Sequence, residues 1–266
     1  MKKIAKIMAL MALLCCVLAF VFAFTGNPLS WVLVRHRASQ YLDIQYPELD
    51  IEIESIIYDH LFGGFDVDVT SPTSRDTHFT LTLDGWGNVK YDRYDAVTSG
   101  ANTVARLSRE YQNLVNNALT GSVFADARVY AEFCTPGTIE YNTFTHNHST
   151  RTRTIEKDFS IDLSALELDQ DYDLAVLGAA HGELDIHITV EDATIEKAAA
   201  LLLALKAELD AHGVAFHAVE FYLSPAGGGQ DIILWDFLSA DIGGEGLVER
   251  VEQAHLEYLA YWAGEE

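Results

Sequence analysis

The chain of 266 residues carries a formal net charge of −23, because 40 acidic residues outnumber 17 lysines and arginines. So negative a surface repels nucleic acid and argues against a nucleic-acid-binding protein. Hydrophobic residues make up 49% of the chain, which excludes an intrinsically disordered protein. The charge is uneven, since residues 164–266 hold 21 acidic and 3 basic residues. This acidity suits solubility, cations or basic proteins.

The first predicted element is a transmembrane helix. Three lysines within the first six residues precede an uncharged apolar run over 7–24, which as a helix would be about 27 Å long, near the thickness of a bilayer core. The lysines predict a cytoplasmic N-terminus and an extracytoplasmic body. A cleaved signal peptide, with Val21-Phe22-Ala23 at the cleavage site, is the alternative. We therefore expect residues 1–25 to be a single-pass signal anchor in the cytoplasmic membrane.

Residues 26–122 are predicted to form a first α+β domain. Apolar residues at helical spacing predict a helix over 31–46, which ends before Pro47. Alternation of apolar and polar residues then predicts three short antiparallel strands, near 51–57, 65–69 and 79–83. A helix over 101–119 completes a helix–meander–helix unit.

Residues 123–266 are predicted to form a second, acidic α+β domain. Strands over 127–133 and 155–163 flank a polar stretch. Asp192 can cap a long helix over 193–212. The remaining elements are strands over 184–190, 216–223 and 231–237 and a closing helix over 245–262. This β-α-β-β-α order predicts an antiparallel-rich sheet covered by helices on one face.

Several short strings stand out together by their order and spacing. They are Asn27-Pro28, Tyr46-Pro47-Glu48-Leu49, Ser71-Pro72-Thr73-Ser74-Arg75-Asp76-Thr77-His78-Phe79, Asn102-Thr103-Val104-Ala105-Arg106-Leu107-Ser108-Arg109-Glu110-Tyr111, Gly182-Glu183-Leu184 and Thr194-Ile195-Glu196-Lys197-Ala198-Ala199. Over most of residues 1–240 the chain resembles the YfjL-like family, small membrane-anchored proteins of Gram-positive bacteria. The resemblance implies an anchored protein that faces outward, and it supplies no activity, cofactor or catalytic residue.

The densest polar cluster contains Ser71, Thr73, Ser74, Asp76 and His78. Asp76 and His78 are two positions apart and would share one face of an extended segment, where they can form an acid–base or cation-binding pair. The alternative is a hydrogen-bonded loop that sets the strand over 79–83.

Arg106 and Glu110 are the helical candidates for the same cluster. They lie four positions apart, a spacing at which side chains on a helix meet. They either pair on a solvated helix face or reach the loop around Asp76.

His146 and His148 are weak candidates for metal ligands. On a strand both would face the same way, as two ligands of one ion do. Glu140 and Asp158 are the conceivable further ligands, and an exposed loop without metal is the alternative. The sequence fixes no third ligand, so we predict no metal site and no cofactor.

Asp169, Asp171 and Asp173 alternate as in a calcium-binding loop, but the pattern is incomplete. Leu174 and Ala180 stand where such a loop requires glycine and glutamate. We therefore predict no calcium site at this position.

Nucleophilic and cofactor-binding motifs give little support for an enzyme. Cys134 is the single cysteine beyond the apolar run, and we interpret it as a structural residue. Gly227-Gly228-Gly229 precedes a predicted strand rather than a helix, unlike a phosphate-binding loop. The motifs of serine hydrolases, zinc proteases and dinucleotide-binding enzymes do not occur.

Together these features favour a non-enzymatic domain tethered outside the cytoplasmic membrane. Such a domain would bind another envelope protein or a peptide, and a sheet edge can receive a strand of the partner. An unrecognised enzyme that uses His78 with Asp76 and an acidic cation-binding module are the alternatives.

Overall fold

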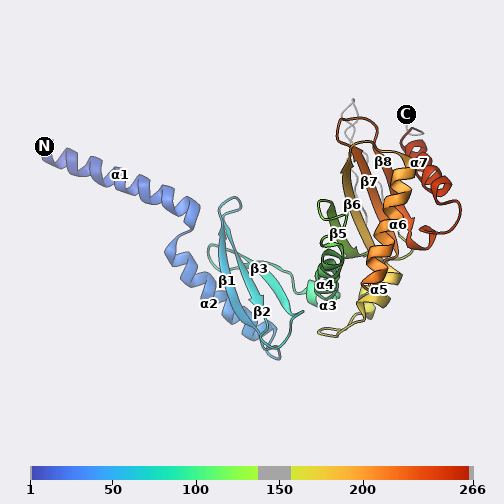
Figure 1. Cartoon of the computed structure of the whole chain (residues 1–266). Helices are drawn as coiled ribbons and strands as arrows, with labels where there is room; N and C mark the ends of the chain where they lie inside the picture. The colour runs from blue at the N-terminus through green and yellow to red at the C-terminus, as the bar shows by residue number, and fades with distance from the viewer. Residues whose placement is uncertain (1, 137–156, 264–266) are drawn as a thin grey trace. The chain divides into compact units, whose positions relative to one another are not determined.

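The computed structural model describes residues 2–136 and 157–263 (Figure 1). The chain divides into two compact units. The first contains residues 1–103 and 167–169, and the second contains residues 104–166 and 170–266. Each unit combines helices with one four-stranded sheet. The predicted α+β class and the antiparallel-rich sheets are confirmed.

The first unit begins with helices α1 (Lys2–Thr25) and α2 (Pro28–Gln45). The Asn27 side chain caps α2 by accepting a hydrogen bond from Leu29 N (2.9 Å), and Pro28 fits the first turn because a helix needs no N–H there. The strands follow as an antiparallel meander in the order β1 (Glu52–Asp59), β2 (Gly64–Thr70), β3 (His78–Asp84) and β4 (Val89–Asp92). The short helix α3 (Asp95–Thr98) comes next.

The core of the first unit lies between α2 and the inner face of the meander. Every second side chain of β2 and β3 is apolar and points to this face, and α2 contributes apolar side chains at every fourth position. The buried members are Val34, Ala38, Leu42, Phe65, Val67, Val69, Phe79, Leu81, Leu83 and Val97. Tyr41 of α2 and Tyr46, the residue that follows this helix, also donate hydrogen bonds to Asp92 Oδ2 of β4 (2.8 and 2.6 Å). Burial and this carboxylate raise the pKa of Tyr41 to about 12.

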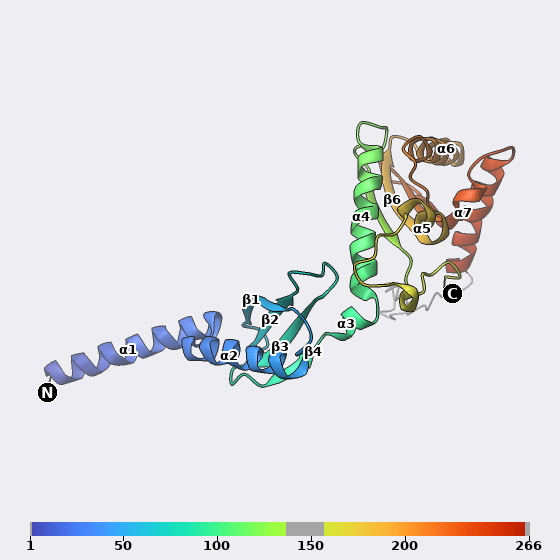
Figure 2. The same cartoon turned by 90° about the horizontal axis from the view of Figure 1, so that it is seen from below.

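The second unit contains a sheet in the order β5 (Arg128–Phe133), β6 (Gly182–Val190), β7 (Ala218–Pro225) and β8 (Ile232–Leu238). Strands β6 and β7 are parallel and joined by α6 (Ile195–Ala211), whereas the other pairs are antiparallel. The inner face shares one hydrophobic core with α4 (Ala101–Leu119), α6 and α7 (Leu247–Ala263). Figure 2 shows these three helices around the strands of this unit. The helix α5 (Leu174–His181) leads directly into β6.

Two local predictions are wrong. The described part of the predicted strand 155–163 is irregular and ends in a short 3-10 turn, Leu163–Ala165. Phe159 and Ile161 are buried there without a ladder, since local bonds such as Ser160 Oγ to Lys157 O (2.8 Å) satisfy the backbone. The cap of α6 is Thr194 rather than Asp192, because its hydroxyl accepts a hydrogen bond from Lys197 N (3.2 Å).

The predicted membrane segment also needs correction. A bilayer span requires about 20 consecutive, predominantly apolar residues in one helix. Within residues 2–136 and 157–263, no helix satisfies both the length and the apolarity needed to cross a membrane. This finding contradicts the transmembrane signal anchor predicted at 1–25, with its span at 7–24, and the single-pass membrane location predicted with it.

Candidate functional site

The predicted polar cluster of the first unit is built around Asp76. Asp76 is completely buried, and its Oδ2 accepts a hydrogen bond from Asp169 N (2.8 Å). In return, Asp169 Oδ1 accepts hydrogen bonds from Asp76 N (3.1 Å) and Ser74 Oγ (3.1 Å). Asp169 adopts a positive φ of 60°, which is costly for a residue other than glycine. These reciprocal bonds fix residues 167–169 to the loop that precedes β3.

The other cluster members around this loop bond mainly to one another. Ser71 Oγ lies 3.2 Å from Thr73 Oγ1, and Ser74 Oγ donates to Thr77 Oγ1 (2.7 Å). The His78 ring is partly exposed, and within the described residues no hydrogen bond joins it to Asp76. The structure therefore brings Ser74 and Asp76 together with Asp169, and it does not form the predicted Asp76–His78 pair.

The remaining predicted site residues belong to the second unit or fall outside the described residues. Arg106 is buried in the second unit, where it donates to Glu110 Oε1 (3.1 Å) and to Gln170 O (2.9 Å). His146 and His148 fall within 137–156, outside the described residues, and so does Glu140. Asp158 belongs to the irregular segment that leads to Ile161.

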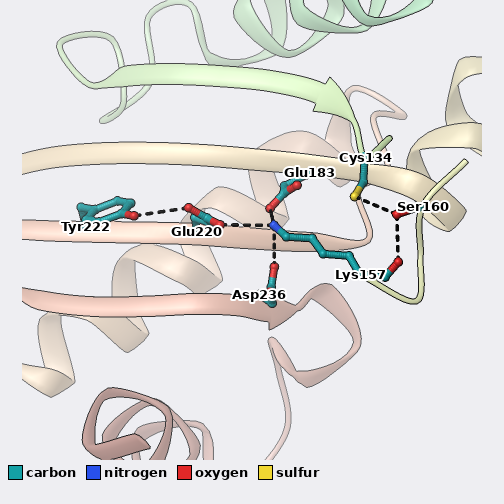
Figure 3. A network of polar contacts seen from close by, with 7 residues as sticks. All are labelled: Cys134, Lys157, Ser160, Glu183, Glu220, Tyr222 and Asp236. Atoms are coloured by element: carbon teal, nitrogen blue, oxygen red, sulfur yellow. Dashed lines mark hydrogen bonds and ion pairs between the residues drawn. The ribbon is translucent and has the colours of Figure 1, made fainter. Parts of the chain in front are cut away.

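A second polar cluster, which we call the carboxylate–lysine cluster, lies on the outer face of the second sheet (Figure 3). It consists of Lys157, Glu183 of β6, Glu220 of β7 and Asp236 of β8. Lys157 Nζ forms ion pairs with Glu183, with Asp236 Oδ1 (2.8 Å) and with Glu220 Oε1 (3.2 Å). The Lys157 side chain is only 4% exposed, so one ammonium is buried among three carboxylates.

The backbone around Lys157 is held by bonds to the ends of β5 and α5. Ile161 N donates to Cys134 O (2.8 Å), and His181 Nδ1 lies 2.8 Å from Phe159 O. The Ser160 hydroxyl bridges Lys157 O (2.8 Å) and Cys134 Sγ (3.5 Å), as Figure 3 shows. These contacts place the lysine over the sheet, so its position does not depend on the ion pairs alone.

The electrostatics of the cluster favour charge compensation over nucleophilic chemistry. Burial opposes the charge of Lys157, but the hydrogen bonds that its ammonium donates to Asp236 and Glu183 outweigh it and keep the lysine pKa well above its ordinary value. Burial also raises the pKa of the Cys134 thiol. A protonated lysine and a protonated thiol are both poor nucleophiles. The arrangement therefore supplies no activated nucleophile from either residue.

The three carboxylates would otherwise suit a cation. One ligand oxygen from each of Glu183, Glu220 and Asp236 lies within 4.8 Å of the others, and oxygen ligands of this kind bind Ca²⁺ or Mg²⁺. The Lys157 ammonium, however, already bonds to all three groups. In this conformation the lysine fills the place that a cation would need.

Glu183 is expected to make the stability of the protein depend on pH. Burial raises its pKa from 4.5 to about 7, against the opposing attraction of Lys157. Between these two pKa values the folded protein keeps a proton on Glu183 that the unfolded chain releases. This proton stabilises the folded state fully below about pH 4.5, and the stabilisation is lost as the pH rises through about 7. We expect urea unfolding to show a loss of up to about 3 kcal/mol between pH 4.5 and pH 8.

The Glu183→Gln variant should remove most of that pH dependence. Glu132→Gln is the matched control, because Glu132 lies opposite Glu183 on β5 but is exposed. A Glu183→Gln protein with the same pH profile as Glu132→Gln would contradict the assignment.

The sequence held only a diffuse sign of the carboxylate–lysine cluster. Glu183 and Glu220 occupy polar positions of alternating strands, but polar residues on such a face are usually solvated. Lys157 follows a long polar stretch and has no strand or helix of its own. The grouping arises because β6, β7 and β8 are neighbours, and that adjacency is a property of the topology.

Both edges of the second sheet are occupied by helix side chains. At the β5 edge, Gln112 Oε1 of α4 accepts a hydrogen bond from Ala131 N (2.7 Å), and Ser108 Oγ accepts one from Phe133 N (3.1 Å). At the β8 edge, the buried His255 of α7 accepts a hydrogen bond from Ile233 N (3.2 Å). A groove of about 490 Å³ lies between α7 and the far end of β8. Neither edge is open along its whole length.

The first sheet differs, because β1 is an eight-residue edge strand that pairs only with β2. Within the described residues, no helix side chain forms a hydrogen bond to the backbone of β1. The opposite edge strand, β4, has only four residues. An unoccupied edge of this length presents a row of backbone donors and acceptors.

The ladder shows which β1 groups face outward. Thr80 O of β3 accepts a hydrogen bond from Arg93 N (3.2 Å), so Thr80 is directed toward β4 and its neighbour Leu81 toward β2. Leu81 stands opposite Val67, whose backbone groups are therefore used by β3. Val67 in turn stands opposite Ile56. The N–H and C=O of Ile56 consequently point away from the sheet.

A groove of about 450 Å³ lies between α2 and the start of β1, and we call it the α2–β1 groove. Its lining combines a few apolar side chains with charged residues. The lining residues are Arg35, Ser39, Leu42, Asp43, Tyr46, Pro47, Leu49, Ile51, Glu52 and Ile53. An extended peptide that paired with β1 from Tyr58 toward Glu52 would run directly to this groove.

Comparison with protein families gives two matches along the chain. The family model for the YfjL-like, N-terminal domain matches residues 1–93, and the model for the YfjL-like C-terminal domain matches residues 110–252. No curated protein and no solved structure matches the chain. The first match contains β1 and the α2–β1 groove, and the second contains the carboxylate–lysine cluster.

Proposed function

The chain belongs to the YfjL-like family through both of its domains, and we propose that it is a non-enzymatic binding protein that receives an extended segment of another protein along β1. The observation that carries this proposal is the open edge of β1 beside the α2–β1 groove. Strand addition uses backbone hydrogen bonds for affinity and neighbouring pockets for selectivity.

The contrast between the two sheets supports the proposal. Residues of α4 and α7 engage backbone groups on the edges of the second sheet, which discourages pairing with a further strand. The eight residues of β1 lack such cover in the described structure. The sheet of one unit has covered edges, and the sheet of the other has a long uncovered edge. This difference suits a protein that binds a partner strand at β1 alone.

The proposed binding mode also agrees with the chemistry of the buried polar groups. Asp76 is engaged by Asp169, and Lys157 is engaged by three carboxylates. Such groups stabilise the fold that presents β1. The proposed role of the protein is therefore recognition of a partner, without a chemical step.

The test uses three eight-residue peptides in which valine alternates with lysine, threonine or glutamate. We expect at least one of them to bind the full chain and to protect the amide of Ile56 from hydrogen exchange. Ile56→Pro removes the outward N–H, whereas Ile56→Ala removes a similar amount of side chain and keeps it. Since losing one such hydrogen bond costs about 1–2 kcal/mol, Ile56→Pro should bind about tenfold more weakly than Ile56→Ala.

Both variants must first show the thermal unfolding of a folded protein. If none of the three peptides alters exchange along β1, the proposed function is wrong. Equal affinity of Ile56→Pro and Ile56→Ala would place the peptide away from the β1 backbone and would also overturn it.

A further inference from the structure

We infer that the segment received by β1 is basic and places lysine or arginine side chains at the α2–β1 groove, an inference that rests on the proposed function. Exposed carboxylates surround the groove and the approach to it. They are Asp43 on α2, Glu48 and Asp50 in the connection, and Glu52 and Glu54 on β1. Arg35 is the one basic residue in the lining.

These carboxylates have no internal counter-charge. In residues 2–136 and 157–263, none of the five takes part in an ion pair or accepts a side-chain hydrogen bond. Elsewhere the protein does pair solvent-accessible acids with bases, as Lys90 with the partly exposed Asp84 (3.1 Å) and Lys206 with the exposed Asp210 (3.4 Å). The groove is thus a local surplus of negative charge, which attracts a basic segment and repels an acidic one.

The acids are also grouped at one end of β1. Glu52 and Glu54 belong to β1, whereas Glu48 and Asp50 lie in the connection that leads into it. A β-bulge between Ile53 and Ser55 changes the direction of Glu54 relative to the regular strand that follows. A peptide paired with β1 therefore meets its carboxylates at the groove end of the strand, beyond Ile56.

The geometry distinguishes this site from the other acidic cluster of the molecule. Glu183, Glu220 and Asp236 are mutually close and already neutralised in part by Lys157. The acids at the α2–β1 groove are exposed and border both a cavity and an open strand edge. They are consequently available to side chains of a peptide whose backbone is held by β1.

The experiment compares the three alternating peptides on the full chain at low salt. We expect the valine–lysine peptide to bind about tenfold more tightly than the valine–threonine peptide, a difference of about 1.4 kcal/mol, as two or three exposed ion pairs provide. The valine–glutamate peptide should bind most weakly. About 0.5 M salt should remove most of the difference, because the charges are solvent-exposed.

Charge reversal identifies the place of binding. The double variant Glu52→Lys and Glu54→Lys should reverse the order of the three peptides. Its matched control is Glu191→Lys with Asp192→Lys, which changes the net charge equally at two exposed acids of the second unit. The control should keep the preference for the valine–lysine peptide.

The outcomes separate this inference from the proposed function. If the valine–threonine peptide protects Ile56 and binds as tightly as the valine–lysine peptide, strand addition stands and the basic partner is wrong. If the valine–lysine peptide keeps its affinity for the Glu52→Lys and Glu54→Lys variant, the lysines of the peptide interact with other residues of the protein, and the inference also fails. If no peptide protects Ile56, both proposals fail.

Discussion

Replacement of Lys157 by alanine is expected to lower the free energy of unfolding by about 3–5 kcal/mol. The substitution removes the one ammonium from a site where Glu183, Glu220 and Asp236 lie close together. Like charges at this separation cannot all remain ionised in a buried site, so the carboxyls must take up protons or the strands must separate. Urea unfolding at pH 7.5, followed by circular dichroism, measures the loss.

Two comparisons make this result specific. Lys206→Ala removes a lysine that pairs with Asp210 on an exposed helix face, and it should cost less than about 0.5 kcal/mol. Adding Glu183→Gln to Lys157→Ala should recover part of the lost stability, because one of the competing charges is removed. A loss for Lys157→Ala no larger than that for Lys206→Ala would show that the ion pairs contribute little.

Asp76→Ala is expected to destabilise the first unit by about 3 kcal/mol. The carboxylate of Asp76 is fully buried and accepts the hydrogen bond from Asp169 N. Its removal leaves that partly buried donor without its acceptor, while the strained backbone of Asp169 loses a contact that holds it. Hydrogen exchange in residues 167–169 and thermal unfolding of the full chain measure the effect.

The matched control is Asp50→Ala, which removes an exposed aspartate of the same unit and should leave stability within about 0.5 kcal/mol of the parent. His78→Ala should also be mild, since the ring is partly exposed. Comparable losses for Asp76→Ala and His78→Ala would instead support a joint role of the two residues.

Secondary structure was predictable wherever one face of an element is buried. The helix predicted over 101–119 is α4, Ala101–Leu119, because its inward residues recur with the helical period. The strands predicted near 65–69 and 79–83 are β2 and β3, whose alternating exposure follows the alternating sequence. In the helix and in the strands alike, the spacing of the buried residues in the structure equals the spacing of the apolar residues in the sequence.

Elements without a periodic pattern escaped prediction. The helix α5 has the sequence Leu-Ala-Val-Leu-Gly-Ala-Ala-His, which is apolar all round and gives no preferred face. The strand β4 has only four residues, too few for an alternation to stand out. The segment 157–162 contains apolar residues but folds irregularly, because Phe159 and Ile161 are buried by contacts rather than by strand pairing.

The candidate site was harder to predict than the fold for a physical reason. The Asp76 loop was visible as a dense polar string, but its partner Asp169 lies 93 residues away. Lys157, Glu220 and Asp236 come from segments that are far apart in the sequence. Their proximity depends on the strand order of the second sheet, which the sequence pattern does not reveal. Local spacing therefore indicated polar loops, and long-range topology decided what those loops contact.

Because β1 is long and uncovered while the other sheet edges are short or covered, strand pairing between copies of this protein is restricted. Fibre growth by strand pairing requires a donor edge and an acceptor edge on every molecule, so that each addition creates the next docking place. The side chains of Gln112 and His255 obstruct two edges, and β4 offers only four residues. Two molecules joined through β1 would exhaust their long free edges, and assembly would close at a pair instead of extending into a filament.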